Sequence, residues 1–316
     1  MKDYNLKKMY DMQQYQEIIR LFNTFQEEKT DELKLYTGFV FTKMGMATKA
    51  IECLTSINQK QFYQYIGKIY RYLGVSNYLL GKYDMAQSLF DLGTEKNDKE
   101  SDLWNKLLFP PLDDIRETKN FIFHFVDKIS AVDKKLFILK SIKAFARISE
   151  FIGELNLCKK IDIYIYSQRQ DSIGNSLSYS DNGLKVIHTY LHDVKGHEIA
   201  HILFNSIYKN MNRNKFIDEG IATFFDDENT FIEFIRKYKS ALPNLDVVQV
   251  WNDTNLILEN VKGIYYYAGA FVGYLIKTYG KHKFIEFIQN ENYDNAQSLF
   301  GDSLDFTIQN FYNEIV

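Results

Sequence analysis

The residues best suited to chemistry lie in one short segment, Gly196–Phe204, which reads Gly-His-Glu-Ile-Ala-His-Ile-Leu-Phe. Its apolar spacing predicts a helix. Histidines four residues apart, here His197 and His201, lie only about 40° apart around a helix and roughly 6 Å along it, so both imidazoles can reach one metal ion. Glu198, next to the first histidine, is placed to act on a water molecule at the metal instead of binding the metal. The alternative is a surface helix that carries these letters by chance.

A candidate third ligand follows after 17 intervening residues, in the segment Phe216-Ile217-Asp218-Glu219-Gly220-Ile221-Ala222. Together the two segments resemble the gluzincin metallopeptidases, the thermolysin-like and aminopeptidase-like zinc enzymes. In those families the third ligand is a glutamate on the next helix, commonly in an (Asn/Asp)-Glu-Gly-x-Ala setting. The resemblance implies one zinc ion per chain, held by His197, His201 and Glu219. A fourth position would remain for water, as catalytic zinc requires.

The resemblance covers about residues 117–316, and only the two zinc motifs in it are highly specific. The predicted elements follow the order of the peptidase MA-like group: a strand at 121–126, a long helix at 133–156, a strand at 161–166, an edge-like strand at 184–190 and the HExxH helix. The segments 265–275 and 299–304 are also similar to that group. A small sheet followed by helices is an α+β arrangement, and we expect helices to dominate it.

Three consecutive tyrosines, Tyr265, Tyr266 and Tyr267, are candidates for a further catalytic role. In related enzymes a tyrosine or histidine C-terminal to the glutamate ligand donates a hydrogen bond to the oxyanion of the tetrahedral intermediate. Such a neutral donor acts mainly in the transition state. Tyr266 fits the Tyr-x-x-Gly pattern of aminopeptidases and is slightly preferred, whereas Tyr265 fits the Tyr-x-x-Ala-Gly pattern of the peptidase MA-like group. The alternative is that all three rings are core or groove-lining aromatics.

Two features of the related enzymes are not visible in this sequence. No Gly-x-Met-Glu-Asn segment precedes HExxH, so the acidic anchor with which aminopeptidases hold a free N-terminus is not found, and endo- and exopeptidase action both stay open. Thr223 stands where thermolysin-like enzymes carry an aspartate that supports a ligand histidine. Asp218, Asp226 or Asp227 could supply that carboxylate, or each could be a solvated acid. His188 could reach substrate across the cleft, or be an ordinary packed or exposed imidazole.

The chain before residue 116 has an internal repeat. A self-comparison at an offset of 36 aligns small residues with small ones and large apolar residues with each other: Gly38 with Gly74, Gly45 with Gly81, Ala50 with Ala86 and Leu54 with Phe90. The second copy resembles a tetratricopeptide repeat, whose usual period is about 34 residues, and plain helical hairpins are the alternative. We therefore expect a helical module at 1–115 that binds a protein partner or substrate. Pro110-Pro111 would separate it from a peptidase domain at 116–316.

The overall composition narrows the class of protein. Hydrophobic residues make up 46% of the chain, and only three residues are proline, so we expect a folded protein with long helices. The net charge of −3 gives no electrostatic case for nucleic-acid binding. The longest uncharged stretch is too short to span a membrane, and the beginning of the chain has no apolar signal segment, so we expect a cytoplasmic protein. No GxGxxG, Walker-type or GxSxG motif supports nucleotide binding or serine-hydrolase chemistry.

Taken together, these patterns predict a zinc-dependent peptidase that acts on peptides or proteins. Glu198 would take a proton from water and deliver it to the leaving amine, while Tyr265 or Tyr266 would stabilise the oxyanion. The rival hypothesis is a tetratricopeptide-type interaction or regulatory protein whose peptidase-like domain binds metal without turnover. The presence of Glu198 argues against it, because a structural metal site has no need of that carboxylate.

Overall fold

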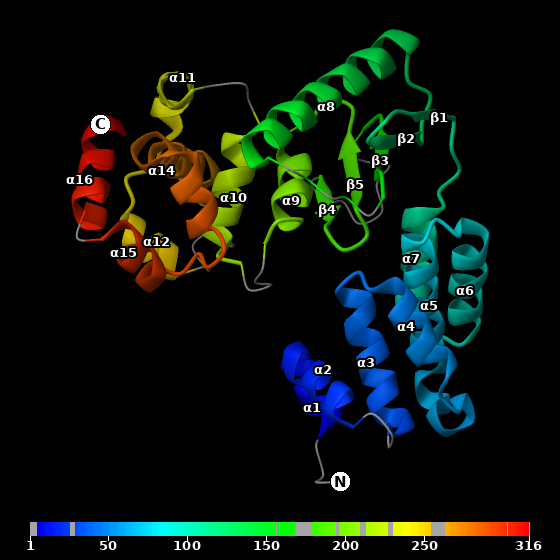
Figure 1. The fold of residues 1–316 in the computed structure, drawn as a ribbon. Helices are drawn as coiled ribbons and strands as arrows, with labels where there is room; N and C mark the ends of the chain where they lie inside the picture. Colours follow the sequence, from blue (N-terminus) through cyan, green and yellow to red (C-terminus); the bar gives the residue numbers. More distant parts are fainter. Residues whose placement is uncertain are drawn as a thin grey trace.

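The computed structural model describes residues 5–25, 29–153, 155, 157, 159–168, 178–193, 196–208, 213–226, 230–253, 263–301 and 303–315 (Figure 1). Within these ranges helices dominate, and five short strands form one mixed sheet. The predicted α+β class is therefore confirmed at this level. None of the helices in these ranges combines the length and the apolar character needed to cross a membrane.

The N-terminal part of the chain consists of helices joined by short turns. Their bounds are α1 Leu6–Asp11, α2 Tyr15–Thr24, α3 Asp31–Lys43, α4 Ala47–Thr55, η1 Gln59–Tyr65, α5 Ile66–Leu79, α6 Tyr83–Glu95 and α7 Lys99–Leu108, where η marks a 3₁₀ helix. The connection from α7 to the first strand contains Pro110-Pro111, and both residues lie outside any helix.

The 36-residue repeat corresponds to two hairpins, α3–α4 and α5–α6, that make equivalent contacts. A Cβ added at Gly38 of α3 would lie 2.6 Å from the side chain of Leu54 on α4. A Cβ added at Gly74 of α5 would lie 2.9 Å from the ring of Phe90 on α6. The turn inside each hairpin has a glycine with positive φ, 71° and 72° respectively: Gly45 and Gly81. The repeated glycines therefore let each pair of helices pack closely and let the chain reverse between them.

The sheet has the strand order β1-β2-β3-β5-β4. The strands are β1 Asp114–Glu117, β2 Phe121–Phe125, β3 Ile161–Tyr166, β4 Tyr179–Asp181 and β5 Val186–Tyr190. The three central strands, β2, β3 and β5, are parallel, while β1 and β4 pair antiparallel with their neighbours at the two edges.

The prediction of an edge strand at 184–190 was wrong, because β5 lies inside the sheet and β4 forms the edge. β4 has three residues, two of them polar, so it lacks the alternating apolar pattern by which strands are predicted. β1 has a single apolar residue, Ile115, and gave no signal either. Short polar strands are typical of sheet edges, where they discourage pairing with other chains.

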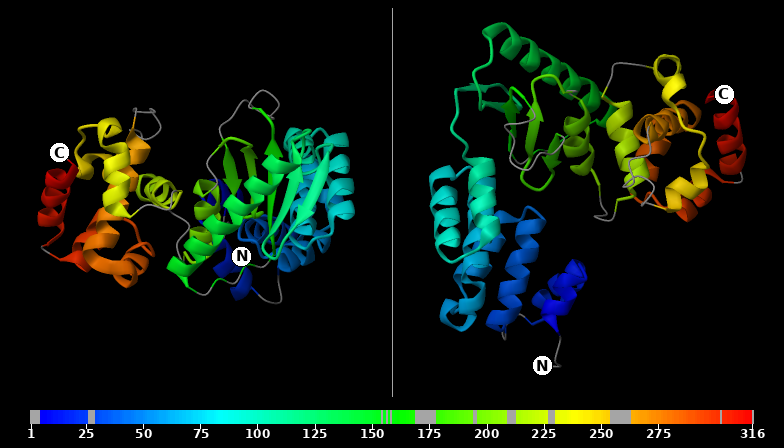
Figure 2. Two further views of the ribbon diagram at one scale, coloured as in Figure 1. Left: turned by 90° about the horizontal axis from the view of Figure 1, so that it is seen from above. Right: turned by 180° about the vertical axis from the view of Figure 1, so that it is seen from behind.

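The two faces of the sheet contact different parts of the molecule, as the views in Figure 2 show. On one face, phenylalanines of β2 and isoleucines of β3 pack in the main core with α8 (Ala131–Ile152) and α9 (His197–Asn205). On the other face, Tyr164 of β3 packs against the N-terminal helices. Its hydroxyl donates a hydrogen bond to the carbonyl oxygen of Leu108 at 2.7 Å and lies 3.2 Å from the hydroxyl of Tyr78. The sheet therefore joins the N-terminal helices to the HExxH helix.

The chain after the sheet is helical in its described part. The bounds beyond α9 are α10 Lys215–Phe224, α11 Phe231–Tyr238, η3 Lys239–Ala241, α12 Val247–Asn252, α14 Ile264–Phe287, α15 Tyr293–Phe300 and α16 Ser303–Ile315. Helix α10 packs against both α9 and α14 (Figure 1). A Cβ added at Gly220 of α10 would lie only 2.7 Å from the carbonyl oxygen of Ala268 on α14, so glycine permits this close approach.

We expect Gly220→Ala to destabilise the protein by about 1–3 kcal/mol, because the new methyl group would push α10 away from α14. Thermal unfolding followed by circular dichroism measures the effect. Thr223→Val, one turn further along α10, is the matched control. Among the described residues the buried Thr223 hydroxyl has no hydrogen-bond partner, so its removal should leave Tm unchanged or raise it. An unchanged Tm for Gly220→Ala would contradict the close packing of the two helices.

Candidate metal centre

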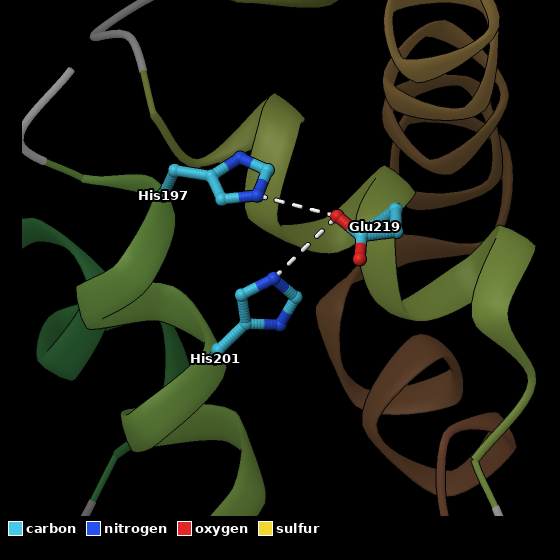
Figure 3. Close-up of side chains that lie close together, drawn as sticks. All are labelled: His197, His201 and Glu219. Atoms are coloured by element: carbon cyan, nitrogen blue, oxygen red, sulfur yellow. Dashed lines mark ion pairs between the residues drawn. The ribbon is translucent and has the colours of Figure 1, made fainter. Parts of the chain in front are cut away.

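Helices α9 and α10 bring three candidate ligands together (Figure 3). His197 and His201 project from α9 and Glu219 projects from α10, and their ligand atoms all lie within 4.8 Å of one another. The Nε2 atom of His197 lies 3.2 Å from Oε2 of Glu219, and Nε2 of His201 lies 3.6 Å from the same oxygen. The two imidazole rings are inclined at 79°, with centroids 4.9 Å apart. The three residues predicted as ligands therefore converge on one point.

The donor set and its spacing fit a zinc ion. Two imidazole nitrogens and one carboxylate oxygen are the ligand set of many catalytic zinc sites. A tetrahedral ion with bonds of about 2.0–2.1 Å separates its ligand atoms by about 3.3 Å. The nitrogen-to-oxygen distances of 3.2 and 3.6 Å are close to that value.

The charged groups at this point strongly influence one another's protonation. Burial alone would lower the pKa of His201, but hydrogen bonds with Asp218 and Glu219 raise it well above its ordinary value. Burial alone would raise the pKa of Glu219, but hydrogen bonds with His197 and His201 hold it far below the usual range. Glu219 is therefore ionised at neutral pH, as a ligand to a cation must be.

The first candidate ligand, His197, is anchored by Asp226, which lies two residues after the end of α10. The Oδ1 atom of Asp226 accepts hydrogen bonds from the backbone N–H groups of Gly196 and His197, both at 2.9 Å. Because α9 begins at His197, this carboxylate satisfies amides at the helix N-terminus and lies at the positive end of the helix dipole. A Cβ added at Gly196 would lie 2.7 Å from the carbonyl oxygen of Phe225, so glycine allows the two segments to meet.

The second candidate ligand, His201, contacts Asp218. The Oδ1 atom of Asp218 lies 3.3 Å from Nδ1 of His201, which leaves Nε2 of that ring facing Glu219. A carboxylate in this position fixes the orientation of a metal-binding histidine and makes it a stronger ligand. Of the three aspartates considered for this support, Asp218 contacts the ring of a ligand and Asp226 binds the backbone of another. Asp227 lies outside the described residues.

The three candidate ligands lie in a cleft of about 610 Å³. Besides the ligands, its walls come from β4, from α9 and α10 and from the start of α14, and they include Ser178, Tyr179, Ser180, Asn182, Asp193, Glu198, Thr223, Tyr265 and Tyr266. Glu198 is only 9% exposed and lines this cleft. A cavity of this size accommodates several residues of a peptide or a small molecule.

The consecutive tyrosines lie in different surroundings. The ring of Tyr265 lines the cleft with its centroid 6.5 Å from that of His197. Tyr266 also lines the cleft, but its ring stacks on Tyr238 with centroids 4.1 Å apart. Tyr267 is fully buried in the main core. Tyr267 is therefore a core residue and the other two tyrosines line the groove, and of these two Tyr265 has its ring next to a candidate ligand.

His188 does not take part in the cleft. It is 5% exposed and stacks between Tyr164 and Tyr179, with ring centroids 4.9 Å from each. Burial lowers the pKa of His188 to about 3, so its imidazole is neutral at physiological pH. Of the two possibilities for His188, the packed imidazole is confirmed, and the contact with substrate across the cleft is not. The physical reason is that β5 is an interior strand, whose side chains are covered on both faces.

Two charged residues next to the candidate metal centre, Arg213 and Glu291, could not be recognised from the sequence. Arg213 donates a hydrogen bond to Oδ1 of Asp218 at 2.8 Å. Glu291 binds Arg213 from a position 78 residues further along the chain. Neither Arg213 nor Glu291 belongs to the HExxH segment or to the segment around Glu219. A contact between residues 78 positions apart in the chain depends on how the helices pack.

We expect the purified protein to contain about one zinc ion per chain. His201→Ala removes a ligand and should abolish zinc binding, as measured by elemental analysis. The control is His282→Ala, which changes an exposed histidine on α14 and should retain the metal. Removal of zinc by a chelator should lower Tm, and its return should restore Tm, because the ion binds the folded state. A wild-type protein that neither contains zinc nor takes it up would contradict this metal centre.

No protein-family model matches this chain, and the search of the curated proteins found no match. A function is therefore inferred from the HExxH and Asp-Glu-Gly-x-Ala segments and from the convergence of His197, His201 and Glu219.

Proposed function

We propose that this protein is a zinc-dependent peptidase. The observation that carries the proposal is that His197, His201 and Glu219 converge in a cleft together with a further acid, Glu198. Structural zinc sites are closed by four protein ligands, whereas catalytic sites have three and keep one position for water. Zinc in such a site polarises a carbonyl group and lowers the pKa of water to near neutrality.

Glu198 is the general base in this proposal. It follows the first ligand directly on α9, so its side chain points about 100° away from that ligand around the helix. This direction keeps it out of the ligand set while it still reaches the cleft. Its carboxylate accepts the proton of the attacking water and then delivers it to the leaving amine, which needs that proton in order to depart.

Tyr265 is the oxyanion donor in this proposal. Burial, together with the negative charges of Glu219 and Glu198, raises the pKa of Tyr265 above its ordinary value. The phenol therefore keeps its proton at neutral pH and can donate a hydrogen bond to the negative oxygen that develops on the substrate. Tyr266, which the sequence patterns slightly preferred, stacks on Tyr238 instead. These observations favour Tyr265.

The substrate class in this proposal is a peptide or protein in an extended conformation. In the described part of the chain β4 pairs with β5 alone, so its outer edge has no strand partner there. Tyr179 and Ser180 of β4 line the cleft beside the candidate ligands. An extended peptide that pairs with this edge would place its backbone across the metal centre.

The helices at 1–115 form, in this proposal, a tetratricopeptide-like module that binds a substrate protein or another partner, next to a peptidase domain at 116–316. The equivalent contacts of the two helical hairpins support this module. A cavity of about 390 Å³ lies between the helices and the turn before β5, and its lining includes Tyr15, Lys43, Tyr72, Trp104 and Gly183. The hairpin of β4 and β5 borders both this cavity and the cleft of the metal centre.

Glu198→Gln should retain zinc and lose peptide cleavage, with kcat lower by about 10²–10⁴-fold, because an amide cannot accept the proton of water. Cleavage of an unbiased peptide library, followed by mass spectrometry, measures turnover and separates endo- from exopeptidase action. Glu286→Gln, the same exchange at an exposed position of α14, is the control and should cleave like the wild type. Equal cleavage by both variants would remove Glu198 from the mechanism. Absence of cleavage by the wild type would favour a metal-binding protein without turnover.

Tyr265→Phe should lower kcat by about 10²-fold with little change in KM, because the lost hydrogen bond forms mainly in the transition state. Tyr266→Phe removes the neighbouring hydroxyl and keeps its ring, so it is the matched control and should change neither constant appreciably. Steady-state kinetics on one cleaved peptide give both values. The opposite pattern would assign the role to Tyr266, and two small effects would remove both tyrosines from the mechanism.

A further inference from the structure

A buried group of charged residues lies on the Nδ1 side of His201, away from Glu219. Arg213, two residues before α10, contacts two carboxylates at once. Its Nη2 donates to Oδ1 of Asp218 at 2.8 Å and lies 2.8 Å from Oε1 of Glu291. Its Nε lies 3.1 Å from each carboxylate oxygen of Glu291. The side chain of Arg213 is 14% exposed and that of Glu291 only 1%.

One oxygen atom connects this group to the metal centre. Oδ1 of Asp218 accepts from Arg213 and also lies 3.3 Å from Nδ1 of His201. A carboxylate oxygen held by a guanidinium has a defined direction, since charge-assisted bonds from this group are strong and directional. The imidazole ring of His201 is then held with Nδ1 toward the carboxylate of Asp218 and Nε2 toward the other candidate ligands. The chain of contacts therefore runs from Glu291 through Arg213 and Asp218 to His201.

Glu291 also holds the start of α10. Its Oε2 accepts from the backbone N–H of Asn214 at 2.9 Å, and Asn214 caps α10 by accepting from the backbone N–H of Ile217. The indole of Trp251 on α12 donates to the backbone carbonyl of Glu291 at 2.8 Å. Glu291 thereby ties α12 and the turn after α14 to the first residues of α10, the helix that carries the third candidate ligand.

Stability alone does not account for this group of charges. Burial raises the pKa of Glu291 to about 7, even though the charge of Arg213 acts to lower it, so the site is unfavourable for a carboxylate. Replacement of a buried ion pair by apolar side chains of similar volume is often neutral or stabilising. The direct contact with Asp218 points to a second role, which is to orient the groups around the metal.

We propose that Arg213 and Glu291 are positioning residues for the metal centre, which hold Asp218 in the place where it orients His201. This inference rests on the metal site of the proposed function and not on peptidase activity. Its consequence is that zinc affinity and coordination geometry depend on an ion pair in which neither residue contacts the ion. The supporting carboxylates of metal-binding histidines contribute about 10- to 100-fold to affinity in other proteins.

The test uses the full-length double variant Arg213→Met/Glu291→Leu, because either single change would leave a buried charge without its partner. Three quantities are measured: Tm of the metal-free protein, the zinc Kd by competition with a chromophoric chelator, and the visible absorption spectrum of the Co²⁺ form. We expect a lower Tm, because Asp218 and the backbone N–H of Asn214 lose Arg213 and Glu291 as hydrogen-bond partners. We also expect zinc binding weaker by about 10- to 100-fold and an altered Co²⁺ spectrum. Asp218→Asn should weaken zinc binding to a similar extent.

The control is Lys277→Met/Glu314→Leu, which removes an ion pair between α14 and α16 whose side chains are 42% and 40% exposed. It should leave both zinc affinity and the Co²⁺ spectrum unchanged. Wild-type affinity and an unchanged spectrum in the Arg213/Glu291 variant would overturn the proposal, because a merely structural pair predicts that result.

Three further outcomes are separable. If the double variant does not fold, Arg213→Lys keeps the positive charge without the planar fork, and wild-type zinc affinity in that variant would overturn the proposal. A wild-type protein that binds no zinc would overturn this inference together with the metal centre. A wild-type protein that binds zinc and cleaves no peptide would overturn the peptidase proposal and leave this inference standing.

Discussion

The close approach of α9 and α10 is the constraint on which the rest of the site depends. The two helices contribute both histidines and the glutamate, so a shift of either helix would move ligands relative to one another. Carboxylates fasten the helices at two points: Asp226 caps the start of α9, and Asp218 contacts the ring of His201. Gly196 permits this approach, because a Cβ there would lie 2.7 Å from the carbonyl oxygen of Phe225, while Gly220 permits the close packing of α10 on α14. Small residues and local carboxylates therefore determine how the three candidate ligands lie relative to one another.

The sheet provides a second connection, between the cleft and the N-terminal helices. Four aromatic rings stack in one row across the sheet, with neighbouring planes inclined by no more than 12°: His124, Tyr164, His188 and Tyr179. The strand register places these residues directly opposite one another on β2, β3, β5 and β4. The row ends at Tyr179, which lines the cleft, while Tyr164 packs on the N-terminal helices. A three-residue edge strand is thus held in place by stacking as well as by its backbone hydrogen bonds.

Much of the architecture followed from local patterns, and the exceptions have a common cause. The central strands β2 and β3 and the helix α8 are long or strongly apolar, so their types were predictable, although α8 ends at Ile152, earlier than expected. The repeat of glycine and large apolar residues correctly indicated recurring helix pairs. The edge strands β1 and β4 were missed, and β5 was assigned to the edge, because short polar strands owe their conformation to a neighbouring strand and not to their own sequence.

The sequence by itself determined the residues that can act as ligands, because the spacing of His197 and His201 on one helix is set by helical geometry alone. The resemblance to the gluzincins implied that Glu219 would come from a second helix. Only the tertiary structure decided that this helix meets the first, that Asp218 contacts His201, and that Arg213 and Glu291 lie behind it. The tertiary structure also showed that the rings of Tyr265 and Tyr266 have different neighbours, His197 and Tyr238. Such contacts join residues distant in the chain, so they depend on how whole helices pack, and no local pattern of residues encodes that packing.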